Sequence, residues 1–195
     1  MQPDLDLLKQ CCDRIHPLQP DEWEAFSSGW TSLACRRKTV LTAAGETERY
    51  LYFVTEGVQR VYHLSAEGRE ATVIFSYAGS FGGVADSLLT QTASFYFYET
   101  LTSSRFLRLD VYQLQSYISQ FEGIRQLVLK ATAFALKGVL ERQVELQILS
   151  AEEKFRLLLK RSPHVLQIIP HKYLANYLGL DPTTFSKLIA TVRIA

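Results

Sequence analysis

The sequence predicts an α+β protein in three parts: an N-terminal double-stranded β-helix (jelly roll), one long helix, and a C-terminal pair of short helices. Short aromatic and β-branched runs with glycine turns fill the first half of the chain, a long apolar run without proline follows, and proline and glycine punctuate the last stretch. The expected parts are residues 1–120, 121–149 and 150–195.

The β-rich part begins after two expected short helices, at about residues 4–13 and 20–29. Many short strands separated by glycine turns are typical of a sandwich, a jelly roll or a small barrel. The expected strands are residues 50–54, 59–64, 71–75, 95–98 and 105–109.

The long helix, expected over residues 121–149 after a shorter one at 111–119, is apolar on more than one face. A helix with two apolar faces must be covered on both. The β body would cover one face, and the same helix of a second copy would cover the other in a two-fold dimer; complete burial within one chain is the alternative. The residues assigned to the dimer interface are Ile124, Leu127, Val128, Ala131 and Ala135.

Before the C-terminal pair, Ser150 and Glu153 form a capping box for a helix, and an extended piece is expected over 165–169. Pro170 then suits the first turn of a helix, Gly179 can end that helix in the left-handed conformation, and Asp181 is a strong N-cap for the next one. The spacing indicates a helix-turn-helix.

The second helix of that pair has outward positions able to lie against base edges and phosphates. They are short hydrogen-bonding side chains and one cation: Thr183, Thr184, Ser186 and Lys187. The distribution of charge also favours DNA binding by the C-terminal part. Residues 151–195 hold 7 Lys and Arg against 3 Asp and Glu, whereas residues 1–150 hold 14 Lys and Arg against 17 Asp and Glu. DNA binding is therefore predicted, with plain packing of two helices as the alternative.

Several other classes of protein are not expected. No apolar run approaches the roughly 18 residues of a membrane span, and the start lacks a signal pattern, so a cytoplasmic protein without a membrane partner is predicted. The three cysteines lack zinc-site spacing, and His63 alone cannot supply the metal triad of a cupin enzyme. Without a catalytic motif, we expect no catalytic residue, no metal and no cofactor.

Segments 50–64, 79–101 and 150–190 together resemble the CRP/FNR family of transcription regulators, particularly a short-tailed branch. The most specific match is the run KYLANYLGLDPTTFSK, and the resemblance covers nearly the whole chain after about residue 20. It implies a homodimer with a cyclic-nucleotide-binding-like sensor domain, a dimerisation helix and a helix-turn-helix that binds double-stranded DNA, with RNA polymerase as a further candidate partner. The implied DNA contacts are Lys172, Thr183, Thr184, Ser186, Lys187 and Arg193.

The resemblance does not extend to the residues that hold a cyclic phosphate. Members that bind cyclic AMP carry Phe-x-Gly-Glu and, downstream, Arg-Ser/Thr, but here Gly83 stands in place of the Glu and Ala93 in place of the Arg. A cyclic phosphate requires a cation, so a different, unidentified effector is expected. Its predicted pocket is lined by Gly82, Gly83, Ser87, Ala93 and Ser94.

The tail also departs from the family, because Arg193 is the one basic residue after Lys187. Fewer phosphate contacts lower the affinity for DNA. The alternative function is therefore a ligand-binding or protein-interaction module of the same fold that has lost DNA binding.

Overall fold

The computed structural model describes residues 1–192, so Arg193, a predicted DNA contact, lies outside the described residues. The first part contains helices α1 and α2, eight strands with one short helix among them, and helix α4. Their bounds are α1 Gln2–Ile15, α2 Pro20–Ser28, β1 Thr31–Cys35, β2 Val40–Thr42, β3 Tyr50–Glu56, β4 Val58–Leu64, β5 Glu70–Tyr77, β6 Phe81–Gly82, α3 Ala85–Thr90, β7 Phe97–Thr100, β8 Ser104–Asp110 and α4 Val111–Gln120.

The strands form two four-stranded antiparallel sheets, with orders β1-β8-β3-β6 and β2-β7-β4-β5. Buried side chains of both sheets, among them Tyr52, Val61 and Phe106, meet in a core between them. This confirms the mixed α+β class with an antiparallel β body. The strand expected at 95–98 begins later, at Phe97, because the Ser94 hydroxyl bonds both backbone groups of Tyr96 and closes a turn there.

The second part is α5, Glu122–Ile148, and the third contains α6 Ala151–Arg161, α7 Val165–Ile168, α8 His171–Tyr177 and α9 Pro182–Thr191. The prediction of an extended segment over residues 165–169 is wrong, since this segment forms one helical turn. Val165 and Ile169, one turn apart, both enter the C-terminal core, and the Ile169 N–H donates to the Val165 carbonyl. The short helix α3, inside the β region, was not anticipated.

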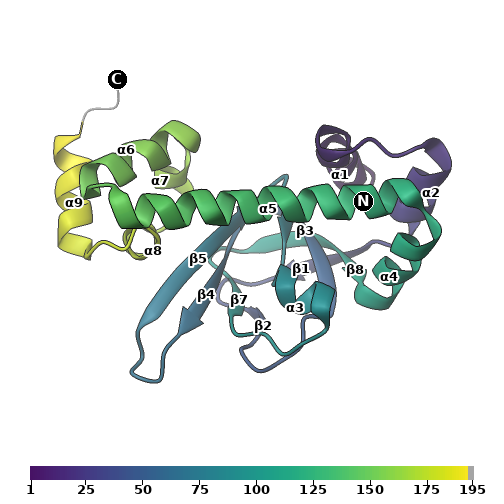
Figure 1. Ribbon diagram of the computed structural model, residues 1–195, viewed down its shortest axis with the longest axis horizontal. Coiled ribbons are helices and arrows are strands. Elements are labelled where there is room, and N and C mark those ends of the chain that lie inside the picture. The colour runs from purple at the N-terminus through teal and green to yellow at the C-terminus, as the bar shows by residue number, and fades with distance from the viewer. Residues whose placement is uncertain (193–195) are drawn as a thin grey trace.

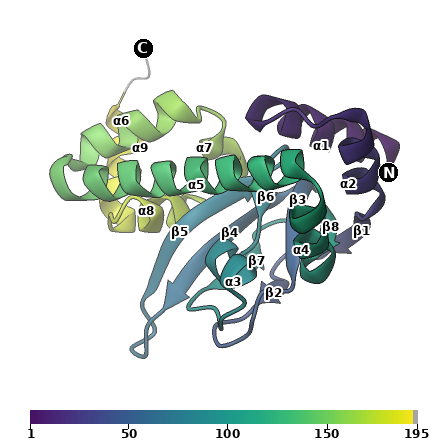
Figure 2. The ribbon, with the colours of Figure 1, turned by 45° about the vertical axis from the view of Figure 1, so that its right-hand side comes forward.

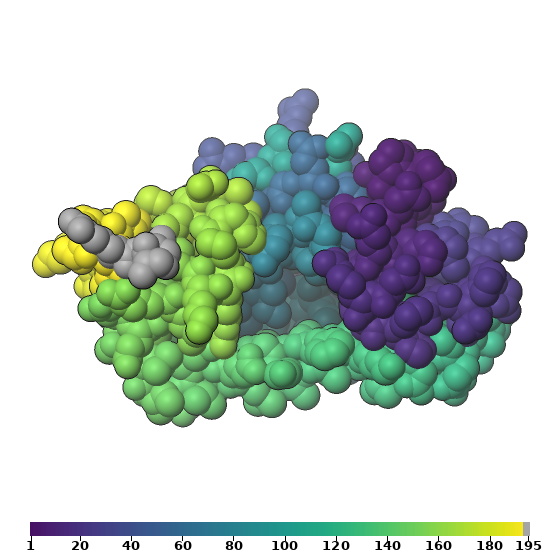
Figure 3. Space-filling model, turned by 90° about the horizontal axis from the view of Figure 1, so that it is seen from above, coloured from purple at the N-terminus to yellow at the C-terminus, as the bar shows by residue number. Residues whose placement is uncertain are grey.

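Helix α5 crosses the whole molecule, with α1, α2 and α4 at one end and α6 to α9 at the other (Figure 1). The β body lies beneath the middle of α5, as the turned view also shows (Figure 2). From above, α5 forms one long edge of the molecule (Figure 3). Among the described helices, none is both long and apolar enough to cross a membrane.

The burial of α5 corrects part of the predicted dimer interface. Ile124 and Leu127 are 0% and 1% exposed, because they pack with α1, α2 and α4 in the core below the start of α5. Val128 and Ala131 are half-buried, and Ala135 is exposed. Ile124 and Leu127 stabilise the chain's own fold and are not available to a partner.

Candidate functional site

A cavity of about 170 Å³ lies between the inner face of α5 and the β body. We call it the α5 cavity. Its walls come from strands β3 to β6, helix α3 and the inner face of α5, with one residue each from α2 and α4. None of the described residues that line it carries a charge. The lining residues are Phe26, Leu51, Val61, Ile74, Ser76, Phe81, Gly82, Gly83, Ala85, Leu88, Leu89, Leu114, Leu127, Val128, Ala131, Thr132 and Ala135.

Of the five residues predicted to line an effector pocket, Gly82 and Gly83 do so. A Cβ on Gly82 would collide with the Tyr98 hydroxyl, and Gly83 has φ +107°, a conformation that favours glycine. The predicted Ser87, Ala93 and Ser94 lie outside the cavity wall. Both serine side chains are buried and bonded within the chain, and Ala93 pairs with Thr47 as an isolated bridge.

Glu48 is a buried carboxylate beside these glycines, and sequence reasoning missed it. It lies between β2 and β3, is 1% exposed, and accepts hydrogen bonds from the Thr42 hydroxyl (2.6 Å) and the Val84 N–H (3.2 Å). The N–H groups of Arg49 and Tyr50 also donate to it. Burial raises the pKa of the Glu48 carboxyl, and the donated hydrogen bonds oppose that rise. The buried Glu48 carboxylate thus accepts a hydrogen bond from the Val84 N–H, the backbone donor immediately before α3.

Helix α9 carries four of the six predicted DNA contacts: Thr183, Thr184, Ser186 and Lys187. Asp181 caps the helix by accepting from the Thr184 N–H (2.9 Å), and it also accepts from the Thr184 hydroxyl. The Ser186 hydroxyl donates to the Pro182 carbonyl (2.9 Å). Thr183 and Lys187 are exposed at the surface of the helix, and neither serves as a cap of α9. Gly179 has φ +63° in the turn before α9, as its place in the sequence predicts.

Helix α8 is held against the β body by a cluster of polar and aromatic groups, of which Arg60, Glu99 and Tyr173 are buried. Arg60 of β4 is 1% exposed; its Nε donates to Glu99 (2.7 Å), and its guanidinium lies 4.2 Å from the centre of the Tyr173 ring of α8. Lys38 bridges the two sides, since its Nζ lies 3.1 Å from Glu99 and 2.6 Å from the Tyr173 hydroxyl. We call Lys38, Arg60, Glu99 and Tyr173 the junction cluster.

Two further contacts fix α8 in place. The Asn176 carboxamide accepts from the Thr72 N–H (2.6 Å) and donates to the Glu70 carbonyl (2.7 Å), so one side chain satisfies two backbone groups of the edge strand β5. From the other side, the Arg142 guanidinium of α5 donates to the Tyr177 carbonyl and lies 4.1 Å from the Tyr177 ring centre. The predicted DNA contact Lys172 is exposed but lies over the Tyr173 ring, near the junction cluster.

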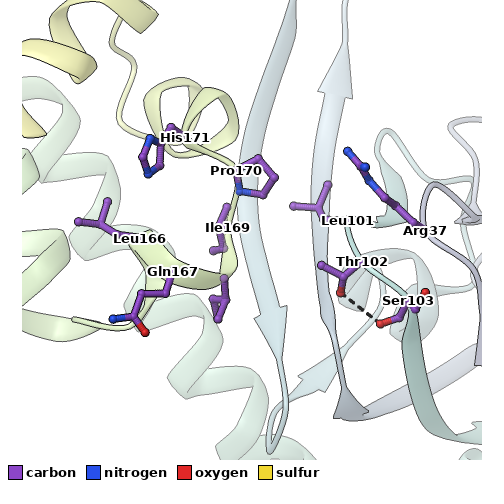
Figure 4. Close-up of a pocket in the computed structure, with 10 residues that line it drawn as sticks. Arg37, Leu101, Thr102, Ser103, Leu166, Gln167, Ile169, Pro170 and His171 are labelled. Carbon is purple, nitrogen blue, oxygen red and sulfur yellow. Dashed lines mark hydrogen bonds between the residues drawn. The ribbon is translucent and has the colours of Figure 1, made fainter.

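Beside the junction, a groove of about 620 Å³ is wide open to solvent (Figure 4). Leu166, Gln167 and His171 lie on its C-terminal side, and Arg37 and Ser103 lie on the side of the β body. Its open form and mixed lining mark it as the seam between two packed parts, which distinguishes it from the apolar α5 cavity.

The acid stability of this junction is expected to depend on Glu70. Arg60, which donates to the Glu70 carboxylate at 2.6 Å, holds the pKa of that carboxyl below its ordinary value of 4.5. The Glu70 carboxyl has a higher pKa in the unfolded chain than in the folded one, so the unfolded chain is protonated first as the pH falls. The contribution of ionised Glu70 to the free energy of unfolding is therefore fully present above pH 4.5 and is lost as the pH falls through the lower pKa of the folded state. Urea unfolding of Glu70→Gln between pH 3 and pH 6 should show a shallower acid decline than the parent; an unchanged decline would contradict this.

The outer face of α5 is apolar and faces away from the β body. Its exposed residues follow the three- and four-residue spacing of a helix seam. We call Leu129, Ala133, Leu136, Leu140 and Val144 the outer stripe. Leu129, Leu136 and Leu140 are each more than half exposed, at 61%, 57% and 57%. A row of exposed leucines on one helix is typical of a protein–protein contact surface.

Comparison with known proteins agrees with this architecture. Residues 33–121 match the family model of the cyclic nucleotide-binding domain. Solved structures with a similar fold include FixK2 from Bradyrhizobium japonicum (18% identity, 83% of each chain, TM-score 0.74). The catabolite activator protein of Thermus thermophilus is similar at 21% identity, over 90% of this chain and 84% of that one, with a TM-score of 0.57.

A third similar structure is the c-di-GMP responsive global regulator CLP of Xanthomonas campestris, at 16% identity, over 88% of this chain and 90% of that one, with a TM-score of 0.65. A regulator described as of the CRP/FNR family, from Eubacterium rectale, matches at 14% identity, over 89% and 82% of the two chains, with a TM-score of 0.70. No curated protein matches the chain in sequence. Residues 33–121 are therefore similar to the cyclic nucleotide-binding domain, and the chain has a fold similar to that of these solved regulators, one of which is described as of the CRP/FNR family.

Proposed function

We propose that this chain is a dimeric, DNA-binding transcription regulator of the CRP/FNR type, whose effector is a small molecule other than cyclic AMP. The observation that carries the proposal is the outward face of α9. Asp181 caps this helix, Phe185 anchors it in the C-terminal core, and Thr183 and Lys187 stay exposed. Short polar groups and a cation on an exposed helix suit the major groove and its phosphates.

The outer stripe supports the dimer. A two-fold pairing of α5 would cover exposed leucines that no other described residue covers, and it would present two copies of α9 to a duplex. We therefore assign residues 1–120 to the sensor domain, α5 to dimerisation and the part after it to a helix-turn-helix DNA-binding domain. RNA polymerase stays a further candidate partner.

DNA binding is tested by Lys187→Ala. We expect about tenfold weaker binding of a random-sequence duplex, and a log–log salt slope smaller by about 2, since a dimer would lose two phosphate contacts. Fluorescence anisotropy at low and moderate salt measures both quantities. Lys9→Ala, which removes a half-buried lysine of α1 that pairs with Asp13 at the far end of the molecule, is the control and should bind DNA as the parent does.

The alternative, a module of this fold without DNA binding, makes the opposite prediction. Its supporting observation is that the Thr184 and Ser186 hydroxyls already bond within α9. No duplex binding by the folded parent at either salt concentration, or equal affinity of the parent and Lys187→Ala, would favour this alternative.

Cyclic nucleotides are expected not to bind. An anionic cyclic phosphate would meet the buried Glu48 carboxylate, with Ala93 in the place of the family's arginine. Calorimetry with cyclic AMP and cyclic GMP should therefore show no binding tighter than about 1 mM, which corresponds to about 4 kcal/mol. Micromolar binding of either nucleotide would refute this view of the site.

A further inference from the structure

We propose that the α5 cavity binds a small, uncharged and largely apolar molecule of one or two fused rings, and that this is the effector class of the protein. The proposal rests on the proposed function, because it names the ligand of a regulator whose effector is unidentified.

The size of the cavity suits a ring system. An apolar protein cavity of about 150 Å³, lined by Leu, Ile and Phe, stays dry and binds benzene. The α5 cavity is slightly larger, about 170 Å³, and has walls of the same kind, including Leu51, Ile74 and Phe81. One aromatic ring would fit, and two fused rings would fill the space more completely.

The lining offers no partner for a charged or strongly polar ligand. Its two hydroxyl side chains are already engaged: Ser76 lies 3.1 Å from the Tyr98 hydroxyl, and Thr132 donates to the Val128 carbonyl at 2.8 Å. Among the described residues, the buried polar side-chain atoms without a partner lie elsewhere, in Trp30, Arg108, Arg142 and Glu145. A ligand with a charge would lose its hydration here without compensation.

Glu48 excludes an anion from the neighbouring backbone donors. Its carboxylate accepts from the Val84 N–H, and it lies 3.4 Å from the position that a Cβ on Gly83 would take. Gly83 itself lines the α5 cavity. A ligand anion placed beside Gly83 would therefore lie near a buried carboxylate and find the Val84 donor occupied, whereas a neutral ligand would not be repelled.

The cavity shares a helix with the expected dimer surface. Val128, Ala131 and Ala135, which the sequence assigned to the dimer interface, instead line the cavity from α5. Leu129, Ala133 and Leu136 of the outer stripe lie on the opposite side of the same turns. A molecule in the cavity would thus contact the helix through which two copies would pair, which is a suitable place for an effector of this regulator.

The test compares two ligands of the same ring system on the full chain at pH 7, by calorimetry. We expect neutral 2-naphthol to bind with a Kd of about 0.1 mM or tighter. The anionic 2-naphthoate should bind at least about tenfold more weakly. No 2-naphthol binding below about 1 mM, or 2-naphthoate binding as tight as 2-naphthol, would overturn the proposal.

A cavity-filling variant locates the binding. Ala131→Phe should weaken 2-naphthol binding at least about tenfold because its ring takes the ligand's space. Ala66→Phe, the same change in the exposed β4–β5 turn, should leave it unchanged. If Ala131→Phe fails to fold, the smaller change Ala135→Leu on the same wall replaces it. Undiminished binding to a folded cavity variant would overturn the site.

Duplex anisotropy, run in parallel on the same protein, separates this proposal from the proposed function. Binding of DNA without binding of 2-naphthol overturns the effector class and leaves the DNA-binding regulator standing. Binding of 2-naphthol without binding of DNA supports the ligand class and overturns DNA regulation.

Discussion

Leu136→Glu combined with Leu140→Glu should convert the proposed dimer to a monomer. Both leucines are 57% exposed in the outer stripe, so the change should not disturb the fold of one chain. Burial of a leucine stabilises a contact by about 1.5–3 kcal/mol, and a two-fold pair of helices would bury each leucine twice. The variant loses that gain and brings carboxylates of both copies together.

Loss of the dimer should lower the affinity for duplex DNA by at least about 100-fold, since a monomer presents one α9 and loses the effective concentration of the second. Light scattering after size-exclusion chromatography measures the mass, and anisotropy measures the affinity. Leu64→Glu, at a leucine of β4 that is 40% exposed, is the matched control and should leave both unchanged. A double variant that stays dimeric would show that α5 does not pair through the outer stripe.

Arg60→Ala should lower the free energy of unfolding by about 3–5 kcal/mol, because the buried Glu99 carboxylate loses the buried one of its two cations. Glu99 is 5% exposed and would keep Lys38 alone, while Tyr173 would lose the guanidinium against its ring. Urea denaturation measures the loss. Since Tyr173 belongs to α8, proteolysis in the segment between α6 and α8 should also become faster.

The matched control for Arg60→Ala is Arg105→Ala. Arg105 pairs with Glu56 at the same 2.7 Å, but these side chains are 65% and 59% exposed. An exposed ion pair contributes at most about 1 kcal/mol, so this variant should unfold almost as the parent does. Equal losses of unfolding free energy in the two variants would mean that Arg60 in the junction cluster contributes no more to stability than an exposed ion pair does.

Replacing both partners is expected to recover stability. In Arg60→Met with Glu99→Met, no buried charge is left unpaired between these positions, and apolar side chains fill the space. The double variant should therefore be more stable than Arg60→Ala in the same urea experiment. If it also keeps α8 resistant to proteolysis, packing rather than charge holds the C-terminal helices in place.

The local signals of the sequence determined most elements. Pro170, Gly179 and Asp181 act within one or two turns of the chain, and α8, the turn and α9 appear where those residues place them. Strands β3, β4, β5, β7 and β8 follow equally from runs between glycine turns, since such turns act on adjacent residues. Strands β1, β2 and β6 were not expected from the sequence. The extended piece expected over 165–169 was wrong, because the burial of Val165 and Ile169 one turn apart depends on the C-terminal core.

Tertiary structure alone decided how the site is built. The sequence shows that α5 is apolar on more than one face, but only packing divides those residues into Ile124 and Leu127, which are buried, and Leu136 and Leu140, which are exposed. Glu48 belongs to no periodic pattern, and its contact with Val84 joins residues far apart in the chain. Hydrophobic periodicity reports which faces of a helix avoid water, whereas the partner of each face and the neighbour of a buried carboxylate follow from long-range packing.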